Sequence, residues 1–385
     1  MISLDKLVQV GFTVKQATSL ALFFRNIGYL TTNTAGLMTD FSLPENKVVV
    51  IDSIDTLKVV FKADTEDYAL IETILNQKGN MKPNQSKLNN VIVYVGALAE
   101  GQNWGNLVDE MISVNANYAQ LLVATKDAEE IKNAGAKALA NNRLLVAQTD
   151  NEDVANKVTG NVAQALKALN NANVMLMYKE APMEFLNAGV ASIMAQGYLG
   201  AVGSLYSTVT GVTPEDYTAT VNANLDEQNV SYYTYVNPIN GGGVEQYASP
   251  IVVGGYMING EDAKRRYIRY CVDLMLKAKA VDFLKGKHGY TQEASVLLSA
   301  ELNSLFVAFQ TNELVRNTEI VGDKKVYGFE IKVYSPSEIR ELDEEAYNAQ
   351  KWLVKGYYRD VLTGRAVEID LFIDPTDAQL NTLGF

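Results

Sequence analysis

The sequence predicts a three-layer α/β domain with a mostly parallel sheet, inserted into an α+β domain that the two chain ends form. Three observations lead to this fold class. Short apolar runs alternate with amphipathic helical stretches over about residues 25–236. Two long helical stretches follow a glycine-rich break after Asn240. Strand-like alternation of apolar and polar residues occurs at both chain ends. Continuous apolar runs joined by helices are typical of a sheet covered on both faces.

The first element is a predicted strand within residues 7–15, "LVQVGFTVK". Its apolar side chains alternate with polar or small ones, which is the period of a half-buried strand. They are Val8, Val10, Phe12 and Val14. We therefore expect residues 1–24 to form an arm and one strand of the domain made by the chain ends.

Six strands and five helices are predicted for the inserted domain, residues 25–238. The strands are short runs rich in β-branched residues, and the helices are amphipathic or rich in alanine. The strands are 47–52, 90–96, 119–125, 143–149, 173–178 and 230–236, and the helices are 65–77, 105–115, 127–142, 160–171 and 214–229.

The α+β domain is predicted over residues 239–364. It contains two long helices, 261–284 and 292–315, and strands near 326–334 and 351–360. A further strand at 366–373 belongs to a C-terminal arm, 365–385, in which the apolar residues again alternate with mostly polar ones. They are Val367, Ile369, Leu371 and Ile373. Alternating strands at both ends present edges that pair within the subunit or with a neighbour.

Charge is unevenly distributed along the chain. The 385 residues carry a formal net charge of −12, yet "GEDAKRRYIRYCVDLMLKAK", which begins at Gly260, is basic. Ile268, Cys271, Met275 and Ala278 share one stripe of this helix, which predicts a buried face. The basic side chains lie on or beside the other side and are Lys264, Arg265, Arg266 and Arg269. They bind an acidic partner, pair with carboxylates of the same chain such as those at 341–345, or remain solvated.

Catalytic, metal and cofactor sites are not predicted. The chain has one histidine, His288, in the turn between the long helices, and one cysteine, Cys271, on the packed face of a helix. One histidine and one cysteine exclude the usual zinc sites, and the sequence contains no GxxxxGK[ST] phosphate loop. The acidic stretch 341–347 lacks the spacing of a calcium loop. Globally acidic charge disfavours nucleic acid as a partner, and we expect neither a secretion signal nor a membrane span.

The order of segments resembles the contractile-tail sheath proteins of bacteriophages, in the compact form with one inserted domain. Three stretches carry the resemblance: "SIDTLKVVFKADTEDYALIETILNQ" (53–77), "LYSTVTGVTPEDYTATVNANLDEQNVSYYTYV" (205–236) and residues 254–305, which begin "GGYMINGEDAKRRY". The family's usual tryptophan after the acidic helix start is missing, since Ala263 and Lys264 occupy that region.

The resemblance implies a structural, non-enzymatic subunit of a virion tail sheath, assembled in the host cytoplasm. Such subunits stack as hexameric rings around the tail tube protein, meet baseplate and tail terminator proteins, and contract to drive the tube through the host envelope for genome ejection. Terminal arms add strands to neighbouring subunits, and the basic helix would face the tube. The missing tryptophan leaves open the sheath of a phage-derived bacteriocin or secretion apparatus. An α/β hydrolase or nucleotide-binding enzyme is the alternative from a different class.

Overall fold

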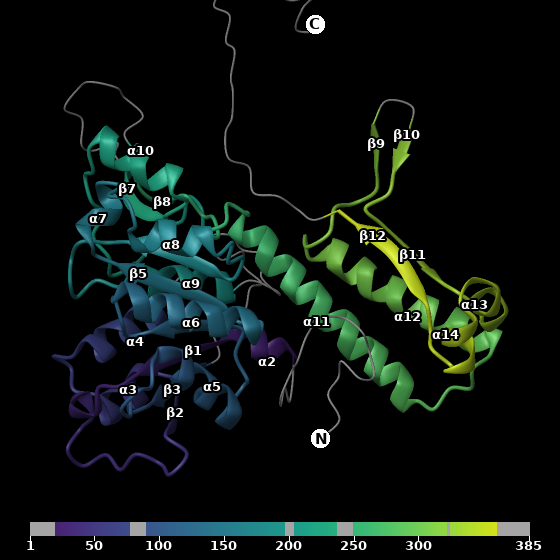
Figure 1. Ribbon diagram of the computed structural model, residues 1–385, viewed down its shortest axis with the longest axis horizontal. Helices are drawn as coiled ribbons and strands as arrows, with labels where there is room; N and C mark the ends of the chain where they lie inside the picture. Colours follow the sequence, from purple (N-terminus) through teal and green to yellow (C-terminus); the bar gives the residue numbers. More distant parts are fainter. Residues whose placement is uncertain (1–19, 78–89, 197–203, 237–248, 322–323, 360–385) are drawn as a thin grey trace, which may run out of the picture.

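The computed structural model describes residues 20–77, 90–196, 204–236, 249–321 and 324–359. Within them, six strands form one sheet at the centre of an α/β unit (Figure 1). Every neighbouring pair is parallel except β2 and β3. In spatial order the strands are β2 (Val48–Ile51), β3 (Asn90–Val95), β1 (Asn26–Thr31), β4 (Gln120–Val123), β5 (Leu144–Thr149) and β6 (Val174–Tyr178). The predicted mostly parallel sheet is confirmed.

The central strand β1 is one that the sequence patterns did not predict. All six of its residues are buried, although it contains an asparagine and a glycine, which are depleted in strands. Gly28 is needed there, because a Cβ atom at this position would lie 2.6 Å from a ring carbon of Tyr118. The Tyr118 ring therefore occupies the space that a side chain at position 28 would otherwise fill.

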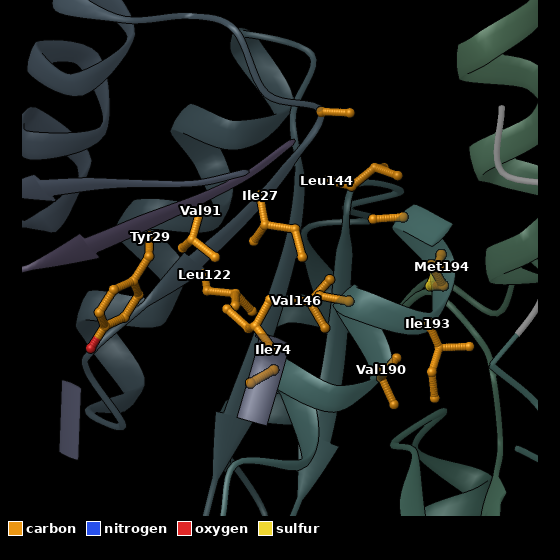
Figure 2. Packing of buried hydrophobic residues seen from close by; sticks show 14 of the residues in the cluster. Ile27, Tyr29, Ile74, Val91, Leu122, Leu144, Val146, Val190, Ile193 and Met194 are labelled. Atoms are coloured by element: carbon orange, nitrogen blue, oxygen red, sulfur yellow. The ribbon is translucent and has the colours of Figure 1, made fainter. Parts of the chain in front are cut away.

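Helices cover both faces of the sheet, which confirms the three layers. Each face buries its own apolar cluster. Figure 2 shows one face, where Ile27 and Val146 of the strands approach Ile74 and Val190 of two covering helices. On this face lie α2 (Leu20–Arg25), α3 (Ile54–Val60), α4 (Glu66–Asn76) and α9 (Leu186–Gln196), and on the other α5 (Trp104–Val114), α6 (Ala128–Ala140), α7 (Glu152–Ala155), α8 (Val162–Ala168) and α10 (Ala219–Glu227). A short 3₁₀ helix, η1 (Thr34–Gly36), follows β1.

The predicted strand 230–236 does not join the parallel sheet as a full member. It forms β7 (Tyr232–Val236), which pairs antiparallel with β8 (Ser249–Val253). Ser231, just before β7, forms an isolated parallel bridge with Met177 of β6. This hairpin spans residue 238, where the sequence places a domain boundary. The proposed division of the chain into domains stays a prediction.

The remaining described residues form a helical layer with two small sheets. The two predicted long helices are confirmed as α11 (Ala263–Lys285) and α12 (Gln292–Thr311). The predicted strands near 326–334 and 351–360 correspond to β11 (Phe329–Val333) and β12 (Val354–Tyr358), which pair antiparallel. The other elements are the hairpin of β9 (Glu319–Val321) and β10 (Lys324–Val326), and the helices α13 (Pro336–Leu342) and α14 (Glu344–Asn348).

Helix α11 joins the α/β unit to this layer (Figure 1). Its N-terminal half packs into the α/β core through Tyr267 and Cys271, which are fully buried. The Tyr267 hydroxyl donates a hydrogen bond to the carbonyl oxygen of Phe24 in α2, at 3.1 Å. Near its C-terminal end Phe283 packs with Leu298 and Leu302 of α12 in a separate cluster. One continuous helix therefore belongs to both parts.

Candidate assembly surfaces

The carboxyl edge of the sheet is the first place to examine, because open α/β sheets bind ligands where the strand order reverses. A hollow of about 340 Å³ lies there, beside the ends of β1 and β4. Asp67 is buried beside it and accepts hydrogen bonds from the Tyr29 hydroxyl at 2.7 Å and from Asn33 Nδ2 at 2.8 Å. Burial and the neighbouring Asp67 carboxylate raise the pKa of Tyr29. These contacts fasten the start of α4 to β1.

Histidine and cysteine are absent from the lining of this hollow. His288 lies in the turn between α11 and α12, as predicted, with its ring stacked on Phe283 at 4.7 Å between centroids. Cys271 is buried on the packed face of α11, and burial raises the pKa of its thiol, which disfavours the nucleophilic thiolate. Neither residue is placed to serve a reaction at the sheet edge.

The described residues contain no group of three or more histidine, cysteine, aspartate or glutamate side chains placed to hold a metal ion. No helix in the same part of the chain combines the length and the apolar character needed to cross a bilayer.

The basic residues of α11 occupy its first two turns, after Asp262. The Asp262 carboxylate caps the helix by accepting a hydrogen bond from the Arg265 backbone N–H at 2.9 Å. Arg266 and Arg269 form polar contacts with side chains of the same chain. The Arg266 guanidinium donates to Asn173 Oδ1 through Nε at 3.0 Å and Nη2 at 2.6 Å. Arg269 pairs with Glu261 at 2.7 Å. Pairing within the chain thus occurs, with partners other than the acidic stretch 341–345.

A second candidate surface is the two-stranded sheet of β11 and β12. Phe329 stacks on Phe306 of α12 with ring centroids 5.1 Å apart, so this side of the sheet covers the helix. The other side carries Glu330, Lys332, Lys355 and Tyr357, all of which are exposed or half-buried. In the described chain, β11 and β12 pair only with each other. A two-stranded sheet has open edges on both sides, and such edges are templates for a further strand.

The predicted arm residues lie outside the described residues. They are Val8, Val10, Phe12, Val14, Val367, Ile369, Leu371 and Ile373. Sequence patterns also missed a buried charge cluster at the carboxyl end of β6. Lys179 is 1% exposed and forms salt bridges with Glu184, at 2.9 Å, and with Glu215. The only signal for it is a lysine directly after an apolar run.

No family model matches the sequence, and no curated protein matches it. Solved structures do match. A chain in the six-fold symmetrised baseplate of the anti-feeding prophage superposes with a TM-score of 0.63 at 12% identity, covering 96% of this chain and 99% of that one. The contracted helical sheath of the same prophage gives 0.56 at 13%, covering 94% and 99%.

A third structure is the sheath tail protein of Desulfitobacterium hafniense. It superposes with a TM-score of 0.50 at 11% identity, covering 84% of this chain and 93% of that one. The chain has the contractile sheath fold. The resemblance predicted from the order of segments is therefore confirmed for the fold, with the match extending over nearly all of two of the three structures.

Proposed function

We propose that this chain is the structural subunit of a contractile sheath. In this proposal subunits stack as hexameric rings around a tail tube and shorten the polymer on triggering, which drives the tube through the host envelope for genome ejection. The observation that carries the proposal is the match, over 94% of this chain, to a protein solved in a contracted helical sheath. The role is structural rather than enzymatic, and the particle is a phage tail assembled in the host cytoplasm.

The sheath of a phage-derived bacteriocin or secretion apparatus is the second candidate. It is favoured by one observation, which is that two of the structures described above come from the anti-feeding prophage. Capsid and genome-packaging genes beside this one would support the phage tail. Their absence, together with complete tube and baseplate genes, would support the second candidate.

Subunits are linked, in this proposal, by β-augmentation of the sheet formed by β11 and β12. A terminal arm of a neighbouring subunit adds a strand to one of its open edges through main-chain hydrogen bonds. The alternating arm residues suit this role, because one set of side chains can face α12 while the other faces solvent. Links of this kind persist while the subunits themselves change orientation.

Contact with the tube is assigned to the basic start of α11, and other contacts to baseplate and tail terminator proteins. All four basic side chains, Lys264, Arg265, Arg266 and Arg269, belong to this contact, and the bonds of Arg266 to Asn173 and of Arg269 to Glu261 hold two of them in position. Charge pairs at an exposed surface are individually weak and screened by salt, which suits a grip that is released on contraction. The acidic α/β unit would lie on the outside.

Negative-stain electron microscopy of the purified protein tests the proposal. Tubes with regular striation are expected at protein concentrations that favour polymerisation. Dispersed particles under all conditions, with or without tube protein, would contradict it.

A further inference from the structure

The hairpin of β9 and β10 extends away from the rest of the described chain (Figure 1). Ile320 is 78% exposed, and Tyr327, just after the hairpin, is 45% exposed. Lys325 lies opposite Ile320 in the antiparallel pairing and places its Nζ 4.9 Å from the centroid of the Tyr327 ring. Lys324 is also exposed. An isolated two-stranded ribbon is at best marginally stable in water, so this ribbon gains stability when a partner covers its apolar face.

A surface with the opposite character lies at α13 and α14. Leu342 is 59% exposed, and its neighbours in sequence are four exposed acidic residues, Glu341, Asp343, Glu344 and Glu345. Beside it is an open hollow of about 520 Å³, lined by Pro336, Ser337, Arg340, Glu341 and Tyr347. Glu344 and Glu345 form no salt bridge within the described residues, and the same is true of Lys324. The face of the hairpin with Ile320 and Tyr327 thus also carries the Lys325 amine, and Leu342 lies among exposed carboxylates.

These two surfaces lie at opposite ends of β12. The strand starts at Val354, six residues after α14 ends. It ends at Tyr358, and the next residue, Arg359, pairs with Glu319 of the hairpin at 2.6 Å. A strand of this length spans about 16 Å, several times the reach of a salt bridge. The hairpin of one copy therefore does not bind the acidic surface of the same copy, but it can bind that of a second copy.

We propose that the hairpin of β9 and β10 docks on the acidic surface of α13 and α14 in a neighbouring copy of this chain. Ile320, Lys325 and Tyr327 share one face of the ribbon. On this face Ile320 and Tyr327 would cover Leu342 and Lys325 would face Glu344 and Glu345, while the neighbouring Lys324 adds positive charge at the same end of the hairpin. A contact between two different patches of identical subunits is heterologous, and repetition of such a contact produces rings or open helices. This inference deepens the proposed function, on which it rests, by naming a surface through which adjacent subunits meet.

Charge exchange provides the test. The variants K324E/K325E and E344K/E345K each replace attraction by repulsion, so each should raise the critical concentration for polymerisation by about tenfold or more. The combined variant restores opposite charges and should return the critical concentration to near that of the unaltered chain. K285E/K287E, at the exposed turn after α11, makes the same change in net charge and serves as the control. Circular dichroism establishes that all variants fold.

A second measurement does not depend on rescue. Polymers are made from an equal mixture of isotopically labelled and unlabelled chains and treated with a carbodiimide, which joins a lysine amine to a carboxylate in direct contact. Mass spectrometry should detect mixed-label crosslinks between Lys324 or Lys325 and Glu344 or Glu345. Single-exchange variants that assemble normally, a combined variant that does not recover, or polymers without these crosslinks would overturn the docking.

The outcomes also separate this inference from the proposed function. A chain that forms no oligomer at all contradicts both. Polymers that form normally but are indifferent to the charge exchanges contradict the docking alone. If the exchanges spare tube-free polymers and block assembly only when tube protein is present, the hairpin contacts the tube instead, and the docking between copies is wrong.

Discussion

Arg266 and Asn173 are joined by two hydrogen bonds, from Nε and Nη2 of the guanidinium to the same amide oxygen, across 93 positions of sequence. The bonds fasten the first turns of α11 to the start of β6. Asn173 is 1% exposed, so its amide depends on protein partners. This contact gives part of the basic segment a structural purpose, separate from any binding of another protein.

Substitution of this pair should destabilise the chain without regard to assembly. R266A leaves a buried amide oxygen without its charged donor, which costs about 1–3 kcal/mol in the free energy of unfolding. N173A should cost a similar amount. A double-mutant cycle measured by urea unfolding should give a coupling energy of about 1 kcal/mol or more between the two positions. Additive effects would show that the hydrogen bonds do not contribute.

Reversal of the charges of Lys264 and Arg265 tests the tube contact. K264E/R265E should form polymers in the absence of tube but fail to assemble on purified tube, because the proposed contact requires an acidic surface on the tube and the reversed charges would be repelled by it. Raised salt should weaken docking of the unaltered chain in the same assay. Co-sedimentation with tubes measures both effects, with K285E/K287E as the control for net charge. Normal binding of K264E/R265E to tubes would remove α11 from the tube interface.

The cluster of Lys179, Glu184 and Glu215 should make the stability of the fold depend on pH. Although burial opposes it, hydrogen bonds from Thr213 and Lys179 lower the pKa of Glu184 below its ordinary value of 4.5. A carboxyl group whose pKa is lower in the folded than in the unfolded chain stabilises the fold above the unfolded pKa, and this stabilisation is lost as the pH falls through the folded pKa. E184Q should therefore lower the melting temperature at pH 7 and flatten its decline below about pH 4.5.

Glu227 provides the comparison for this experiment. Its pKa is also lowered, mainly by a hydrogen bond from Lys157, but the carboxylate is largely exposed. Solvent screens such pairs, so E227Q should change the melting temperature much less than E184Q does. Equal effects of the two substitutions would mean that the partly buried position of Glu184 adds nothing.

Gly328 should tolerate no side chain. A Cβ atom there would lie 1.8 Å from the Arg316 carbonyl oxygen, because the backbone at Arg316 passes close to Gly328, just before β11. G328A should cost about 1–3 kcal/mol or more and reduce the protection of β11 and β12 against amide hydrogen exchange. G289A serves as the control, because its nearest contact would be an ordinary 3.4 Å. Unchanged exchange in G328A would contradict the crowding.

Deletion of residues 365–385 tests the proposed arm. The α/β unit buries two apolar clusters formed by described residues, so the shortened chain should remain soluble and folded but should no longer form tubes. Sedimentation and electron microscopy measure polymerisation, and circular dichroism measures folding. Long tubes formed by the shortened chain would rule out a linking role, and failure to fold would place the strand within its own subunit.

Most of the sheet could be predicted, because β2 to β6 are continuous apolar runs between helices with polar faces. Helix α9 could not, since all eleven of its residues are buried and no polar face marks its period. Strand β1 was not predicted, because Gly28 interrupts its apolar pattern. A glycine is required there because the Tyr118 ring leaves no room for a Cβ atom. The sequence was sufficient to predict that the basic residues lie on one helix. It was not sufficient to predict the contact between Arg266 and Asn173, because that contact depends on the packing of segments that are distant in sequence.

Helix α11 contains 23 residues with neither glycine nor proline among them, and it is anchored near one end by Tyr267 and near the other by Phe283. Its length is about 35 Å, so a tilt of about 10° at one end displaces the other by about 6 Å. An uninterrupted helix fixed in both parts works as a lever. A small rotation of the α/β unit, which holds the start of α11, would therefore become a larger displacement of the layer that carries β11 and β12.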